Sequence, residues 1–126
     1  MKAKGRFPKD LVAAIRDGRI LGIRAGTKPH RVIGIWAVVV ENRLFVRSWS
    51  LKQRSWHRTF LEESVGVIVV KGCEIPARAV FTRSERLKTA VDKAYREKFN
   101  TPGSRHYVRG LAQKKRRDTT TELKQG

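Results

Sequence analysis

The sequence predicts an α+β fold, a small antiparallel β-barrel of about six strands with two or three peripheral helices. Three observations lead to this prediction. Segments typical of strands outnumber helical ones, short turns join neighbouring strand segments, and both faces of residues 32–40 are apolar. A strand that is apolar on both faces needs cover on two sides. A barrel interior can cover one face, and a helix or a second subunit the other.

Alternating or β-branched runs between turn residues define the predicted strands. Asn42 tolerates positive φ, so the connection between the second and third strands is expected to be a tight hairpin. Pro76 favours an edge position or a bulge for the strand that contains it, and Cys73 is expected at a strand position or bulge. The predicted strands are residues 19–25, 31–41, 43–49, 65–70, 74–82 and a last one within TTTEL near the end of the chain.

Three segments favour helices. In residues 1–18, Pro8 suits a first helical turn and Gly18 a helix end. Residues 52–62 are expected to form a short helix with Trp56 and Phe60 on its inner side. The third helix begins after Thr82, which has capping-box spacing to Glu85. Its apolar stripe follows helical periodicity and consists of Leu87, Ala90, Val91, Ala94, Tyr95 and Phe99.

Residues 1–126 are interpreted as one domain, since no internal repeat or long linker interrupts the sequence. Residues 105–126 form a basic C-terminal segment that ends in the short strand. Within it, residues 105–117 are interpreted as a basic arm or a lid.

The net charge of +18 arises from 29 Lys and Arg residues against 11 Asp and Glu residues. Such a field attracts polyanions and anionic small molecules, although it also serves solubility and weak nonspecific attraction. The single cysteine, Cys73, excludes an internal disulfide. No secretory signal or apolar run of about 20 residues occurs, so no membrane helix and a cytoplasmic location are expected.

Catalytic patterns of hydrolases and metalloenzymes are absent from the sequence. The three histidines, at positions 30, 57 and 106, lack metal-ligand spacing. Glu62 and Glu63 are adjacent, so on a helix their side chains diverge by about 100°. The sequence therefore predicts no catalytic side chain and no metal site.

The segment SWSLKQRSWHRTF is the main functional signal. Together with Arg47, which directly precedes it, the segment places four cations, the others at positions 52, 54 and 58, among Trp49, Trp56 and Phe60. Aromatic rings pack against a planar partner while cations contact phosphate or carboxylate. A phosphorylated ring cofactor and a nucleic acid both have this chemistry. A solvated basic helix whose tryptophans belong to the core is the alternative.

Several motifs in this order resemble the FMN-binding split-barrel superfamily. They are RAGTKPHR, IWAVVVENRLFVRSWS, KQRSWHRTFLEES, VGVIVV and a late AYREKF helix, spanning roughly residues 19–124. The sequence is most similar to an uncharacterised branch related to deazaflavin-dependent nitroreductases and pyridoxamine-phosphate-oxidase-like proteins. It departs from that pattern at residues 49–54, which replace a glycine-rich loop, and at Ala25, where serine is common.

The resemblance implies a split β-barrel that binds FMN or a deazaflavin and pairs as a homodimer with the cofactor near the interface. The cofactor would carry the hydride of an oxidoreductase reaction. The candidate phosphate contacts are Arg47, Lys52, Arg54 and Arg58. The other candidate cofactor-binding residues are Ser48 and Ser55 as donors, Trp36 or Trp56 beside the ring, and Lys28 and Arg31 at an anionic tail.

Two alternative functions remain open from the sequence. The net charge, the interleaved aromatic residues and the basic run Lys114–Arg117 are also typical of a nucleic-acid-binding module. A barrel that has lost its cofactor and serves as a scaffold is the other alternative. Affinity that falls steeply with salt distinguishes the first of these from a cofactor site.

Overall fold

The computed structural model describes residues 6–28, 31–52 and 55–126 of the chain. Within them lie seven strands and five helices. The strands are β1 (Leu21–Ala25), β2 (Ile33–Ile35), β3 (Ala37–Val40), β4 (Arg43–Val46), β5 (Val65–Val70), β6 (Cys73–Phe81) and β7 (Thr121–Gln125). The helices are α1 (Lys9–Asp17), α2 (Trp56–Glu62), α3 (Glu85–Lys98), α4 (Pro102–Leu111) and α5 (Lys114–Arg117).

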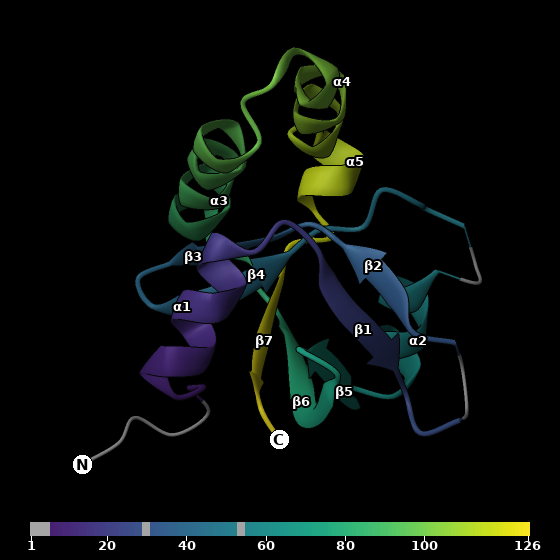
Figure 1. The fold of residues 1–126 in the computed structure, drawn as a ribbon. Coiled ribbons are helices and arrows are strands. Elements are labelled where there is room, and N and C mark those ends of the chain that lie inside the picture. Colours follow the sequence, from purple (N-terminus) through teal and green to yellow (C-terminus); the bar gives the residue numbers. More distant parts are fainter. Residues whose placement is uncertain (1–5, 29–30, 53–54) are drawn as a thin grey trace.

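The strands form one antiparallel sheet in the order β2-β1-β5-β6-β7-β4-β3. Its two edge strands, β2 and β3, are consecutive in the chain and joined by Trp36 alone. The sheet therefore curls until its edges meet through a covalent link instead of a hydrogen-bonded ladder (Figure 1). This confirms the predicted antiparallel barrel with peripheral helices.

Alternating side chains divide the apolar residues between two cores. On β3, Ala37 and Val39 pack into the first core, whereas Val38 and Val40 pack into the second. The first core fills the barrel with residues from β1 and β3 to β7, and α1 and α2 add side chains to it. The second lies between the outer face of β3 and β4 and the helices α3 and α4. Both faces of β3 are thus covered, as the sequence predicted, and α3 and α4 cover its outer face.

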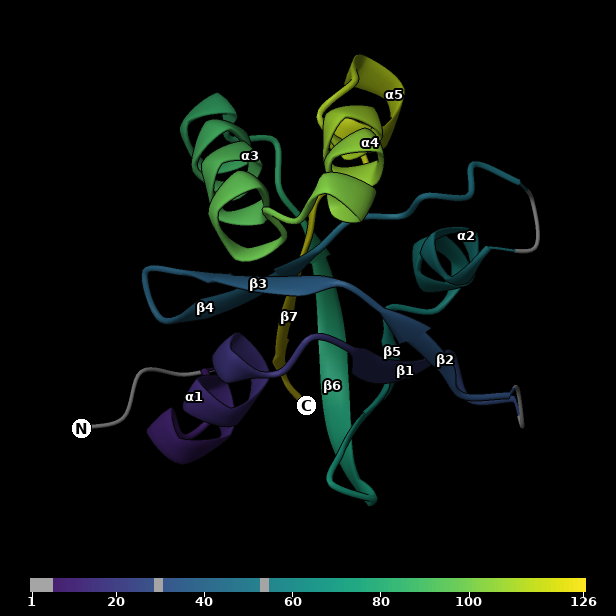
Figure 2. The same ribbon diagram turned by 45° about the horizontal axis from the view of Figure 1, so that its top comes forward.

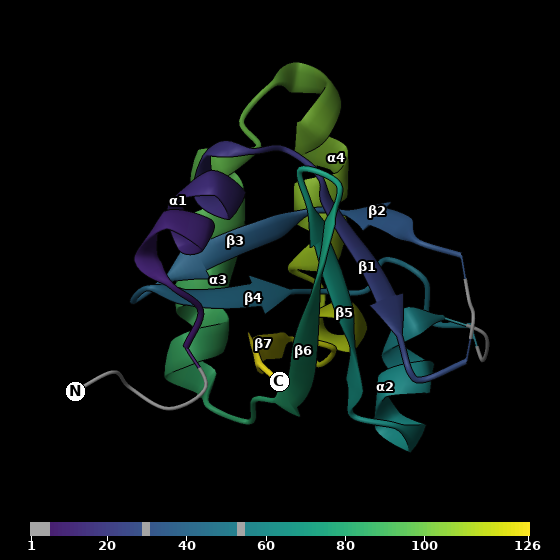
Figure 3. The same cartoon turned by 60° about the horizontal axis from the view of Figure 1, so that its bottom comes forward.

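The helices take different sides of the barrel. In Figure 2, α3 and α4 lie side by side on one side of β3, while α1 lies on the other. Figure 3 shows the β5–β6 hairpin in front, with α2 beside β1 and β5 and the chain ending next to β6. The side of the barrel near β2 carries α2 and the connection from β4 (Figure 1).

One long strand over residues 31–41 was expected, and this prediction is wrong. Residue 36 belongs to neither strand: β2 pairs with β1, and β3 pairs with β4, at opposite ends of the sheet. The extra strand raises the number from about six to seven. The following hairpin is confirmed, because Glu41 and Asn42 both have positive φ, 55° and 60°.

Two local predictions need correction. Thr82 is not the N-cap of α3, since Ser84 accepts the hydrogen bond from the Leu87 amide at 3.2 Å, and Thr82 accepts one from the Ser84 amide. Pro76 marks neither an edge nor a bulge, because β6 lies between β5 and β7 in unbroken register. Its carbonyl accepts from the Gly126 amide, so the missing N–H faces the region beyond the end of β7.

Residues 105–117 are not the extended basic arm that was one of the two interpretations. They form most of α4 and the whole of α5, and Val108 and Leu111 are buried in the second core. Pro102 occupies the first turn of α4, where its missing N–H costs nothing. Thr121 then begins β7, the central partner of β4 and β6.

Candidate functional site

A cavity of about 600 Å³ opens where the barrel edges meet, between β2, the connection from β4 to α2, and α4. Its walls are mostly apolar and include three tryptophans and a tyrosine. The lining residues are Ile20, Ile33, Gly34, Ile35, Trp36, Arg47, Ser48, Trp49, Ser50, Lys52, Ser55, Trp56, Tyr107 and Leu111. Its volume lies within the range of small-molecule sites, which is about 300–1,000 Å³.

Trp36, at the strand break, is contacted through its backbone by Tyr95 of α3 and through its ring by Phe99, the residue that follows α3. The Tyr95 hydroxyl donates to the Trp36 carbonyl at 2.8 Å and accepts from the Arg47 amide at 3.1 Å. The indole stacks on Phe99 with ring centroids 4.2 Å apart and an interplanar angle of 6°. Burial raises the pKa of Tyr95, so its hydroxyl stays protonated and remains a donor. These contacts hold Trp36 in the cavity wall.

Trp49 forms the opposite wall and rests on α4. A Cβ atom at Gly110 would lie 2.4 Å from the indole, so only glycine permits this approach. The Arg116 guanidinium lies 4.0 Å from the Trp49 ring centroid, and its Nε donates to the Trp49 carbonyl at 2.7 Å. Trp49 is still 40% exposed. Backbone and ring contacts with α4 and α5 therefore define this side of the cavity.

Polar groups near the cavity come from the connection between β4 and α2. Ser48 is buried; its amide donates to Thr119 Oγ1 at 2.9 Å, and its hydroxyl donates to the Ser50 carbonyl. Ser55 caps α2 by accepting from the Arg58 amide. Lys52 is exposed and has no ion-pair partner among the described residues. Its ammonium group is thus free to meet an anion.

Arg47 contributes to the wall but directs its guanidinium into the protein. Nε donates to Thr120 Oγ1 at 2.8 Å, Nη2 to the Lys88 carbonyl at 2.8 Å, and Nη1 to Asp92 and to the Leu111 carbonyl. Burial lowers the pKa of Arg47, while Asp92 acts in the opposite direction. Its donors tie β4 to α3, α4 and β7, and this use leaves them unsuited to a ligand phosphate.

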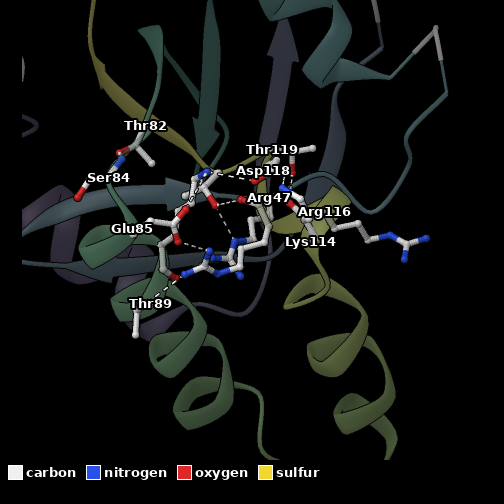
Figure 4. A network of polar contacts seen from close by, with 12 residues as sticks. Arg47, Thr82, Ser84, Glu85, Thr89, Lys114, Arg116, Asp118 and Thr119 are labelled. Atoms are coloured by element: carbon white, nitrogen blue, oxygen red, sulfur yellow. Dashed lines mark hydrogen bonds and ion pairs between the residues drawn. The ribbon is translucent and has the colours of Figure 1, made fainter.

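Figure 4 shows Arg47 within a larger polar network between α3 and α5. Arg117 donates to Asp92 and Glu85, and Lys88 pairs with Asp118 at 3.1 Å. The Arg116 side chain extends away from this network (Figure 4). The network fixes the helices, whereas Arg116 serves the wall of the cavity.

The structure brings six of the ten candidate cofactor-binding residues together. They are Trp36, Arg47, Ser48, Lys52, Ser55 and Trp56. Arg31 lines a second cavity of about 230 Å³, which shares Ile33 and Trp56 with the first. Lys28 and Arg58 are exposed and line neither cavity, and Arg54 lies outside the described residues.

Sequence reasoning missed the wall that α4 provides. Tyr107 and Leu111 line the cavity from one face of this helix, and Gly110 seats Trp49. Gly110 and Leu111 follow Tyr107 by three and four residues, which is a helical spacing. Because residues 105–117 are rich in basic side chains, they were interpreted from the sequence as an arm or a lid.

Acid–base groups are scarce around the cavity. Its described lining contains no carboxylate or imidazole. His57 lies beside Trp56 and Phe81, and burial, with a smaller contribution from Arg58, lowers its pKa. Among the described residues, no group of three or more His, Cys, Asp or Glu side chains could hold a metal ion. In its described lining, the cavity combines aromatic and apolar side chains with a few hydroxyls and cations.

A family model matches nearly the whole chain, over residues 10–123. Its description is "Uncharacterized protein conserved in bacteria (DUF2255)". The chain belongs to this family. The comparison with curated proteins found no match.

A solved structure similar to this DUF2255 chain is titled "Crystal structure of conserved hypothetical protein Rv2991 from Mycobacterium tuberculosis". The TM-score is 0.58 at 10% identity, over 98% of this chain and 82% of the other. At this identity the similarity supports the fold alone. In residues 6–28, 31–52 and 55–126, no helix has the length and apolar character to cross a membrane.

Proposed function

We propose that the larger cavity binds a planar heteroaromatic ligand of the flavin or deazaflavin class. The observation that carries the proposal is the convergence of Trp36, Trp49, Trp56 and Tyr107 on one cavity of about 600 Å³. Aromatic walls offer a flat ring large contact areas in stacked or edge geometry. The proposal includes the assignment of this barrel to the FMN-binding split-barrel superfamily.

The polar groups fit the remainder of such a ligand. Ser50 and Ser55 supply groups for hydrogen bonds with ring edges, and Lys52 supplies the charge for a phosphate. Arg31 reaches the smaller cavity on the far side of Trp56 and would add a second cation. Arg47 is not part of this set, since its guanidinium already has four partners inside the protein.

A bound flavin or deazaflavin supplies hydride transfer, and oxidoreductase activity is part of the proposal. The chain itself binds and orients the ring and keeps water from the walls of the cavity. The described lining has no carboxylate or imidazole, so Lys52 and Tyr107 are the side chains there that could transfer a proton to or from a substrate.

Homodimerisation stays a prediction from the family resemblance. The outer face of β3, whose apolar character suggested it, is already covered by α3 and α4. Exposed apolar side chains lie instead near the cavity mouth, where Ile20 is 62% exposed and Tyr107 47%. Light scattering with and without FMN would establish the oligomeric state and its dependence on ligand.

Calorimetric titration with FMN, riboflavin and a deazaflavin tests the proposal. Saturation near one equivalent is expected, and Lys52→Ala should weaken FMN about tenfold more than riboflavin, which lacks the phosphate. Ser50→Trp places an indole in the cavity and should abolish binding. Leu61→Trp, on the exposed face of α2, is the matched control and should bind normally. Absence of saturable binding by all three ligands would overturn the proposal.

A further inference from the structure

A cluster of aromatic residues lies on the surface where α4 meets the connection after β4. Trp49, 40% exposed, has its ring centroid 5.1 Å from that of Tyr107 and 6.2 Å from that of His106. Tyr107 is itself 47% exposed, and His106 is exposed. In Figure 2, the connection from β4 passes beside α4 on its way to α2. The two segments thus present several partly open rings side by side.

Unpaired cations lie on the same helices as these rings. Arg105 and Arg109 are four residues apart on α4 and share one face, and His106, three residues before Arg109, lies between that face and Tyr107. Both are exposed, as is Lys115 on α5, and within the described part of the chain none of the three forms an ion pair. By contrast, Arg117 and Lys88 are held by carboxylates between α3 and α5. The local positive charge on this face is not neutralised.

We propose that α4, α5 and the connection after β4, which carries Trp49, form a binding surface for single-stranded nucleic acid. Such surfaces combine cations that follow the phosphate backbone with aromatic side chains on which unpaired bases stack. Arg116, which packs on Trp49 at 4.0 Å, joins both kinds of group in one unit. A duplex has its bases stacked internally and uses only the charge. The net charge of +18 favours the encounter with any polyanion.

The cations of this surface are not part of the proposed flavin site. Arg105 and Arg109 do not line the cavity, whereas Tyr107 and Trp49 belong to both. Replacing the two arginines therefore changes nucleic-acid binding while FMN titration stays as in the wild type. Failure of either proposal leaves the other intact.

Fluorescence anisotropy with a labelled oligo-dT and a labelled duplex, over a range of KCl concentrations, tests the proposal. The variant Arg105→Gln/Arg109→Gln should weaken oligo-dT binding at least about tenfold at low salt and reduce the salt slope by about 1.4, as expected for two lost phosphate contacts. The control Lys71→Gln/Arg78→Gln removes the same charge from exposed sites on the β5–β6 hairpin. It should change binding by less than about twofold.

Tyr107 separates stacking from charge. Tyr107→Leu should weaken oligo-dT about tenfold with an unchanged salt slope, and Tyr107→Phe should restore wild-type affinity. Circular dichroism confirms that each variant is folded. Equal losses in both charge pairs, or duplex affinity equal to that for oligo-dT with no effect of Tyr107→Leu, would overturn the proposal. Either result would show attraction to net charge alone.

Discussion

The two sides of the barrel break differ in how they are filled. Over β3 and β4, α3 packs Val91 and Tyr95 into a closed second core, and every donor used by Arg47 ends on a protein partner. Trp49 follows Arg47 by only two residues, but it lies on the β2 side, where it borders the cavity of about 600 Å³. The packed side forms the frame that holds the tryptophans, and the hollow side remains available for a ligand. Substitutions on the two sides should therefore differ in kind.

Arg47→Met should give the largest effect, because it acts on the frame. Removing one partner of a buried ion pair typically costs about 3–5 kcal/mol, and Asp92 together with two carbonyls would lose a donor. Denaturant unfolding measures the loss. Lys52→Met, on the hollow side, is the control and should change the free energy of unfolding by less than about 0.5 kcal/mol. Similar values for both variants would break the comparison.

Tyr95→Phe tests how the frame fixes the strand break. The hydroxyl joins the part-buried Trp36 carbonyl and the buried Arg47 amide, so its removal leaves both backbone groups without this partner. We expect a loss of about 1–3 kcal/mol in the free energy of unfolding. Tyr107→Phe, at an exposed hydroxyl, should have almost no effect. A loss below about 0.5 kcal/mol in Tyr95→Phe would mean that other contacts define the break.

Gly110→Ala tests the packing of Trp49 on α4, where the packed side meets the cavity. Alanine should gain about 1 kcal/mol in helix propensity, but its Cβ would overlap the Trp49 ring, and overpacking costs about 1–3 kcal/mol. We expect a net loss of about 1 kcal/mol and a red shift in tryptophan emission as Trp49 moves into water.

Gly103→Ala is the matched control on the same helix. A Cβ at Gly103 would meet nothing within 4 Å, so this change should stabilise the protein by up to about 1 kcal/mol without a change in emission. If both variants were stabilising, Trp49 would not rest on Gly110 as described.

His57 gives the smallest expected effect, a shallow dependence of stability on pH. Burial lowers the pKa of His57 in the folded protein. The unfolded chain therefore binds the proton more readily, and the free energy of unfolding should decrease as the pH falls through about 6.5. His57→Phe keeps the ring contacts with Trp56 and Phe81 and should remove this part of the dependence. Urea denaturation at about pH 7.5 and 5.5 measures it.

Most of the barrel could be predicted from local signals. Turn residues such as Asn42 and β-branched runs such as residues 65–70 mark strands directly. The break at Trp36 has no such signal, because neither glycine nor proline stands there. There the Trp36 carbonyl accepts a hydrogen bond from the Tyr95 hydroxyl, 59 residues away in the chain. A contact of this kind is tertiary and leaves no periodicity in the sequence.

The candidate site could be predicted in part. The segment SWSLKQRSWHRTF predicted Lys52, Ser55 and Trp56 as ligand contacts, and these three residues line one cavity. Composition could not show where Arg47 points, because its partners Asp92 and Thr120 lie 45 and 73 residues away. The basic residues of α4 led to its interpretation as an arm or a lid, so the helix that forms one cavity wall was not predicted from the sequence.

An NMR titration with FMN tests the central claim most directly. The chain contains three tryptophans, and all of them line the cavity. A two-dimensional ¹H–¹⁵N spectrum should therefore show all three indole N–H signals shifting together and saturating near one equivalent of FMN. Signals that stay in place, or that drift without saturation while exposed basic segments shift, would contradict a ring-binding site in this cavity.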